Sequence, residues 1–230
     1  MNIDINFLLD KPEFTKTAIL KINPLAPLSM VTNVPGSYYK TEHQPDKYML
    51  CGLFENLLNF HLTIQDRTII RRKIKNYYQR EKIGNYLTES SNVGFQPIIN
   101  HLFEIELPIV KPQMIFYEDY WTQHLIGADE RHFKGCINNS WEIENDIIKL
   151  NKENNNKKIS KYFKENISKF PMYYRSPKLR EFMIAKGEYL IKLKMTENLF
   201  LLIKNILTKN NNGYLGTSEG WVDLEIGELI

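Results

Sequence analysis

The chain has 230 residues, of which 43% are hydrophobic and 25% are charged, and its formal net charge is only +3. This length fits one large domain, or a core domain with a sizeable insertion, and the apolar residues suffice for a buried core. No stretch approaches the run of about 18 apolar residues that a membrane span needs, and acids occupy the N-terminal segment where a signal peptide carries lysines. We therefore expect a cytoplasmic protein without a membrane partner. The two cysteines, Cys51 and Cys136, lie in unlike contexts, so we expect reduced thiols and neither a metal site nor a cofactor.

The start of the chain predicts a strand followed by a long ordered loop. Residues 15–22 alternate in polarity, with Ala18, Leu20 and Ile22 on one face. Residues 23–46 contain four prolines, but also Met30 and two tyrosines, which favours an ordered loop. A loop of this length is usually functional or disordered, so it is a candidate region for a binding site.

Two helices are expected after this loop. Asp46 is a suitable N-cap for the first, over residues 47–62, where apolar residues recur at helical spacing. Gly52 costs this helix about 1 kcal/mol against alanine, which suggests a close approach by another backbone. The second helix, over residues 67–82, should bury Ile74 and Tyr77.

The middle of the chain is mixed. Residues 99–107 alternate as a strand until Pro108 interrupts the pattern, and residues 114–117 predict a short strand. The polar run over 151–158 is expected to be a surface loop.

The last part of the chain predicts a hairpin, a helix and a final strand. The hairpin over 181–194 should turn at Lys186 and Gly187. Thr196 then caps a helix, and a glycine-rich loop over 213–220 leads into a strand. Without the insertions the order is β-α-β-β-α-β, that of the ferredoxin-like, RRM-like α+β fold, which hosts RNA-recognition domains and many unrelated functions.

Three segments resemble the fifth family of CRISPR-associated proteins, "Cas five", of the RAMP superfamily. The first runs from KINPLAPLSM through PGSYYK to PDKYMLCGLFENLLNFHL, the second is SPKLREFMIAKGEYLIKL, and the third is GYLGTSEGW. The middle of the chain, roughly residues 63–170, matches no pattern of the family. The first loop also lacks the phenylalanine-arginine pair of the family's commonest form, which leaves the subtype open.

The resemblance implies a role as well as a fold. Members hold the 5′ repeat-derived handle of the guide RNA (crRNA) in a class 1 CRISPR effector complex, which acts in antiviral defence. Their partners are the guide RNA, the backbone Cas subunits and either a large subunit or a recruited nuclease, with target nucleic acid engaged indirectly. The implied architecture is a single RAMP domain over 1–230 with a thumb inserted after the first helix, roughly over 64–170.

A concentration of positive charge supports a polyanion partner. Residues 66–82 hold seven basic residues and two acids, a net charge of +5 that leaves −2 for the rest of the chain. Arg71, Arg72 and Lys75 are the expected contacts, and the alternative is an ordinary solvated helix face.

Two loops add further candidates. Tyr38, Tyr39 and Lys40 combine stacking surfaces with a cation, as single-stranded RNA recognition requires, although one tyrosine is expected to pack into the core. The glycine-rich loop lets backbone amides approach phosphates. Its alternative is a plain helix-to-strand connection with Gly213 as C-cap, and Glu219 would repel phosphate. The expected RNA contacts are Tyr38, Tyr39, Lys40, Lys47, Arg71, Arg72, Lys75, Gly213, Gly216, Thr217 and Ser218.

No catalytic residue is predicted. Metal-free RNA cleavage needs a general base and a general acid, and none of the five histidines is in a recognisable arrangement of this kind. His61 and His101 are expected on apolar faces, and His124 and His132 are too loosely spaced for zinc. The alternative hypothesis is a metal-independent endoribonuclease that processes CRISPR repeat RNA, with His43 beside Tyr38 and Lys40.

Overall fold

The computed structural model describes residues 5–33, 38–83, 86, 89–124, 139–152, 156–171 and 173–229. The chain divides into two compact units, residues 1–117 with 181–230, and residues 118–180. His132 and Cys136, for which the sequence predicts no metal site, lie outside the described residues. No helix in the described ranges is long and apolar enough to cross a membrane.

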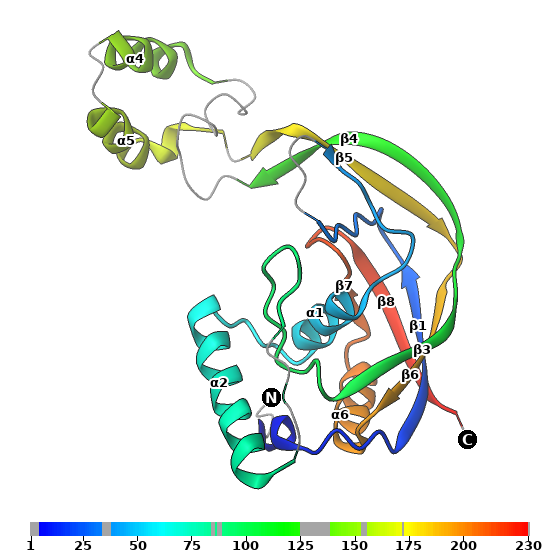
Figure 1. Ribbon diagram of the computed structural model, residues 1–230. Helices are drawn as coiled ribbons and strands as arrows, with labels where there is room; N and C mark the ends of the chain where they lie inside the picture. Colours follow the sequence, from blue (N-terminus) through cyan, green and yellow to red (C-terminus); the bar gives the residue numbers. More distant parts are fainter. Residues whose placement is uncertain are drawn as a thin grey trace. The chain divides into compact units, whose positions relative to one another are not determined.

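The first unit is built on an antiparallel sheet of five strands (Figure 1). The strands are β1 (Lys16–Pro24), β3 (Phe103–Val110), β6 (Tyr189–Met195), β7 (Asn212–Tyr214) and β8 (Trp221–Glu228), in the order β3-β6-β1-β8-β7. Leu20 in the central strand β1 pairs with Ile191 of β6 and Ile226 of β8. The predicted alternation of β1 is confirmed, since Ala18, Leu20 and Ile22 are fully buried.

Helices α1 (Lys47–Leu57) and α6 (Glu197–Leu207) lie on one side of this sheet (Figure 1). Phe54 of α1 makes an edge contact with Phe103 of β3, with ring centroids 5.3 Å apart. The predicted cap is confirmed, because Asp46 accepts a hydrogen bond from the Met49 amide at 2.7 Å. The helix ends at Leu57 rather than at residue 62, so His61 is exposed and lies outside it.

The other side of the sheet carries paired charges. Lys21 of β1 lies 3.3 Å from both Glu188 and Glu225, and Glu106 of β3 lies within 3 Å of Lys192 and Lys194. Acids and lysines on neighbouring strands therefore neutralise one another across this face.

Helix α2 (Ile64–Glu81) packs beside the N-terminal 3-10 helix η1 (Ile5–Leu9). The expectation that Tyr77 is the core tyrosine is wrong, because Tyr78 is 1% exposed and Tyr77 is only half-buried. Tyr78 donates its hydroxyl to the Asp10 carbonyl and packs edge-on against Tyr86 and His101. The N-terminal segment, which sequence spacing alone does not place, decides which face of α2 is covered.

The prediction of a β-hairpin over residues 181–194 is also wrong. The turn exists, with Gly187 at φ 109°, but β5 (Tyr173–Lys186) and β6 belong to different sheets. The second sheet has the order β2-β5-β4, with β2 (Tyr38–Tyr39) and β4 (Gln113–His124). Strand β3 continues through Pro108, and its register with β6 shifts between Glu106 and Val110. An edge strand tolerates a proline at such an irregularity.

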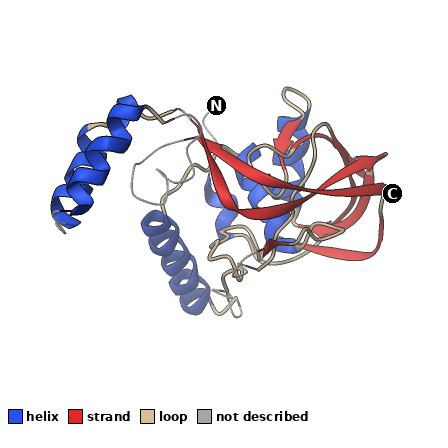
Figure 2. Cartoon of the chain, turned by 90° about the horizontal axis from the view of Figure 1, so that it is seen from above, coloured by secondary structure: helices blue, strands red, loops and turns tan. Residues whose placement is uncertain are grey.

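The second unit contains α4 (Trp141–Lys152), α5 (Asn156–Glu165) and the 3-10 helix η2 (Ile167–Lys169), and Figure 2 draws its helices in blue. Its small core consists of Ile143, Ile147, Phe163 and Phe170. The surface loop expected over 151–158 is therefore wrong at both ends, where residues 151–152 and 156–158 are helical. The apolar residues at i, i+4 spacing on each side bury a shared face, which outweighs the polar composition between them.

Candidate nucleic-acid interface

The glycine-rich loop packs directly on the first long loop. Gly216 has φ +80°, and a Cβ built on it would lie 2.4 Å from the Ser29 carbonyl oxygen. Only glycine tolerates both the left-handed backbone and this close approach. The structure therefore brings together two segments that the sequence singled out separately.

Gly213 has a different reason to be glycine. It lies in β7, where a Cβ would meet Leu53 Cδ1 of α1 at 2.7 Å. The alternative interpretation of Gly213 as a helix C-cap is wrong, because α6 ends at Leu207 and its cap is Thr208.

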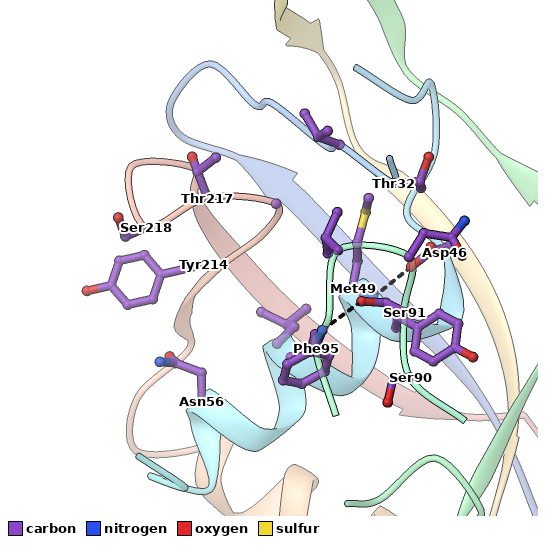
Figure 3. A pocket seen from close by; sticks show the side chains of 17 residues that line it. Thr32, Asp46, Met49, Asn56, Ser90, Ser91, Phe95, Tyr214, Thr217 and Ser218 are labelled. Carbon is purple, nitrogen blue, oxygen red and sulfur yellow. Dashed lines mark hydrogen bonds between the residues drawn. The ribbon is translucent and has the colours of Figure 1, made fainter. Parts of the chain in front are cut away.

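A pocket of about 460 Å³ opens where these segments meet α1 and the loop over 90–95. In Figure 3, Tyr214, Thr217 and Ser218 stand on one side of the pocket and Asp46, Ser90 and Ser91 on the other. Thr32 and Val31 of the first long loop complete the wall, and Gly52 of α1 lies in the lining. The close backbone approach expected at Gly52 is wrong, since its nearest neighbour is the Phe95 ring at 3.9 Å.

The walls of this pocket are more apolar than polar, and they are almost uncharged. Among the described residues that line it, Asp46 alone is charged, and its carboxylate already caps α1. The lining combines hydroxyl and amide groups with aromatic and aliphatic side chains, and Thr217 Oγ1 is buried with no hydrogen-bond partner among the described residues. Such walls suit a flat, neutral ring with hydrogen-bonding edges better than a phosphate, which requires cationic or amide donors.

A buried ion pair holds the pocket wall to α1. Glu55, 1% exposed, pairs with Arg67 of α2 and accepts hydrogen bonds from the amides of Ile98, at 2.6 Å, and Ile99, at 3.3 Å. Burial raises the pKa of Glu55, while Arg67 and these amides act in the opposite direction. Arg67 also donates to the Gln96 carbonyl at 3.1 Å.

The same arginine fixes the aromatic part of the wall. The Arg67 guanidinium lies 4.9 Å from the centroid of the Phe95 ring, which faces the pocket. Sequence spacing missed this arrangement, although an acid at position 55 between the apolar Phe54 and Leu58 was a usable signal.

Tyr38, Tyr39 and Lys40 lie beside a second hollow of about 420 Å³, which Lys40, His43 and Lys111 help to line. The Tyr38 hydroxyl donates to Glu181 at 3.3 Å, and both tyrosines of β2 are half-buried. The His43 ring lies 4.9 Å from that of Phe116. Two lysines, Lys40 and Lys111, and one acid, Glu42, line this hollow, so its lining carries a net positive charge, unlike that of the first pocket.

The basic helix α2 separates into two groups of side chains. Arg72 and Lys75 are exposed, whereas Arg71 is only 5% exposed. Arg71 donates to the Glu89 carbonyl and to Ser90 Oγ, so it holds the segment that forms a pocket wall. Lys47 lies 5.6 Å from the Phe103 ring centroid, and burial lowers its pKa.

His101 has a structural environment. Its Nε2 lies 3.1 Å from the Leu8 carbonyl oxygen, and burial lowers its pKa to about 4, so the ring is neutral at pH 7. The neighbouring Tyr78 and Tyr86 hydroxyls donate to backbone carbonyls. Within the described ranges no group of three or more histidine, cysteine or acidic side chains could hold a metal ion.

Comparison with known proteins identifies a family. A family model described as CRISPR-associated protein Cas5p matches residues 3–226. No curated protein matches the chain significantly.

Two solved structures show weak similarity. A chain of the type III-B Cmr-beta complex bound to cognate target RNA and AMPPnP, determined by cryo-electron microscopy, is 12% identical with a TM-score of 0.38. The alignment covers 94% of this chain and 64% of that one, so this chain spans less than two thirds of its length. Oligomeric Cmr4 from Pyrococcus furiosus, a crystal structure, is 11% identical with a TM-score of 0.30, covering 93% and 98%.

Proposed function

The chain belongs to the CRISPR-associated protein Cas5p family, and from this premise we propose that it is a guide-RNA-binding subunit of a class 1 CRISPR effector complex. In this proposal it holds the 5′ repeat-derived handle, packs against the backbone Cas subunits and performs no chemistry.

The strand order supports the ferredoxin-like RAMP fold as part of this proposal. The elements β1, α1, β3, β6, α6 and β8 follow the β-α-β-β-α-β order, with β1 and β6 in the centre of the four strands. Two insertions interrupt that order, one containing α2 and one running from β4 to β5. We assign the thumb to the second insertion, which contains the compact unit 118–180.

The observation that carries the proposed function is the almost uncharged pocket between the glycine-rich loop, the first loop and α1. An unstacked base of the handle fits its aromatic and hydroxyl-bearing walls, with Asn56, Thr217 and Ser218 as hydrogen-bonding partners. Gly216 shapes the pocket by letting the glycine-rich loop approach the Ser29 backbone closely, and Gly213 leaves room for the Leu53 side chain of α1. The exposed cations Lys40, Arg72 and Lys75 then neutralise phosphates outside it.

Fluorescence anisotropy with a labelled RNA of the repeat handle tests this function. The double variant Asn56→Ala/Ser218→Ala should weaken handle binding by about tenfold, because two hydrogen bonds to the base are lost at about 0.5–1.5 kcal/mol each. Asn205→Ala, on the exposed face of α6, is the matched control and should bind like the unaltered chain. Equal affinity of the double variant and the control would refute a handle-binding pocket.

A specific observation also favours the alternative function, a metal-independent endoribonuclease. Lys40, His43 and Lys111 line one hollow, and these side chains are able to transfer protons and stabilise a phosphorane-like charge. Incubation with the chain's own repeat RNA in a chelator separates the two functions. Cleavage at a unique phosphate that is lost in His43→Ala would establish the enzyme, whereas intact and tightly bound RNA supports the structural subunit.

A further inference from the structure

We propose that helix α5 forms a second nucleic-acid-binding surface, which binds the phosphate backbone of a single strand and is independent of the pocket. The proposal concerns the second compact unit and goes beyond handle recognition, because a row of lysines reads charge and not base identity.

The composition of α5 and the residues after it is strongly basic. Residues 156–170 contain five lysines and one glutamate, a net charge of +4 in a chain whose total is +3. The folding of this segment into a helix arranges those charges in space, which an unstructured polar loop would not do.

The helix separates apolar and basic residues onto opposite faces. Phe163 is 1% exposed, Ile159 and Tyr162 pack in the same small core, and the Tyr162 hydroxyl donates to Asp146 of α4 at 3.0 Å. At 100° per residue, Lys157, Lys161 and Lys164 point away from that core, and all three are exposed. With a rise of 1.5 Å per residue, the row is about 10 Å long.

These lysines are poorly neutralised by the described residues. Lys161 lies 3.6 Å from Glu165, but both side chains are largely exposed, so the pair is weak. Lys157 and Lys164 make no ion pair in the described part of the chain. The outer face of the five-stranded sheet is different, because Lys21, Lys192 and Lys194 all meet acids there.

The chemistry of the row favours nucleic acid over a lipid surface. A helix that lies in a membrane interface needs an exposed apolar face beside its lysines. In α5 the large apolar side chains are turned into the unit's core, and the exposed positions from Lys157 to Glu165 are lysine, serine or glutamate. A row of cations without an exposed apolar face on the same helix fits a chain of phosphates.

The test uses the full-length chain and a 20-nucleotide oligouridine RNA, which lacks the handle sequence. The variant Lys157→Gln/Lys161→Gln/Lys164→Gln should bind this RNA on the order of tenfold more weakly at 100 mM salt. It should also lower the slope of log affinity against log salt by about 2, since each single-strand phosphate contact contributes about 0.7. The control Lys11→Gln/Lys186→Gln/Lys209→Gln removes the same charge from exposed positions of the first unit and should leave both quantities near those of the unaltered chain.

Two results would overturn the proposal. One is an α5 variant whose affinity and salt slope equal those of the control. The other is lysine-dependent binding to phosphatidylglycerol vesicles with no such dependence for oligouridine. The α5 variant leaves Asn56 and Ser218 in place, so weaker oligouridine binding by this variant and weaker handle binding by the pocket variant are separate readouts, and the two proposals can fail separately.

Discussion

At the residue scale, the buried pair of Glu55 and Arg67 connects stability to the pocket. Removing one member of a buried ion pair leaves an uncompensated charge, which costs about 3–5 kcal/mol. We expect Arg67→Met to lower the free energy of unfolding by about 3 kcal/mol, measured by urea denaturation. Glu55→Gln/Arg67→Met should recover part of this loss because no charge remains buried. A single variant that loses less than about 1 kcal/mol would contradict this role.

His101 predicts a pH dependence of stability. Its folded pKa, about 4, lies below the ordinary value of 6.5, so the unfolded chain binds the proton more readily between these values. The free energy of unfolding should therefore fall as the pH is lowered from about 6.5 to about 4, by about 3 kcal/mol for a shift of this size. Below about pH 4 this contribution is constant.

The measurement is urea denaturation across this pH range in the unaltered chain and in His101→Gln. The glutamine retains a donor near the Leu8 carbonyl but does not titrate. The free energy of unfolding of this variant should therefore lack the fall that His101 causes as the pH is lowered. His61→Gln, at an exposed position, is the control and should retain it. If the free energy of unfolding depends on pH in the same way in the unaltered chain and in His101→Gln, His101 is not the source of the pH dependence.

At the scale of elements, the glycine-rich loop depends on one backbone conformation. Gly216→Ala would strain the left-handed backbone at a cost of about 1–3 kcal/mol and press a methyl group on the Ser29 carbonyl. We expect a lower melting temperature together with weaker handle binding, because the loop is a pocket wall. Gly227→Ala has open space and no positive φ, so it should change neither property.

Helix α2 should show two separable effects. Arg72→Gln/Lys75→Gln removes exposed charges and should lower the salt slope of handle binding by about 1.4 without changing stability. Arg71→Met should instead lower stability, because it removes the donors to Glu89 and Ser90. An unchanged salt slope in the first variant would mean that the helix presents only a solvated face.

At the scale of the whole molecule, the two units have separate cores. Replacing residues 118–180 by a short glycine-serine linker should leave the first unit folded, with a single cooperative melting transition. Handle binding should persist because the pocket lies in the first unit, whereas oligouridine binding should fall to the level of the α5 lysine variant. A chain that fails to fold after this replacement would show that the first unit depends on the insertion.

The sequence by itself determined the elements whose signals are local. The alternation of β1, the Asp46 cap, the helix that begins after Thr196 and the last strand follow from periodicity and capping over a few residues, and the structure has them. The family resemblance, carried by three motifs in order, is confirmed by the family model.

Only the tertiary structure decided that β5 and β6 enter different sheets, that Tyr78 rather than Tyr77 is buried, and that Arg71 points inward. These outcomes depend on which distant segment covers a given face. The N-terminal segment with η1 covers α2, residues 89–90 accept hydrogen bonds from Arg71, and the first loop packs against Gly216. Periodicity identifies a face that is able to be buried, but the free energy of burial is gained only against a partner, and the partner is chosen by the whole chain.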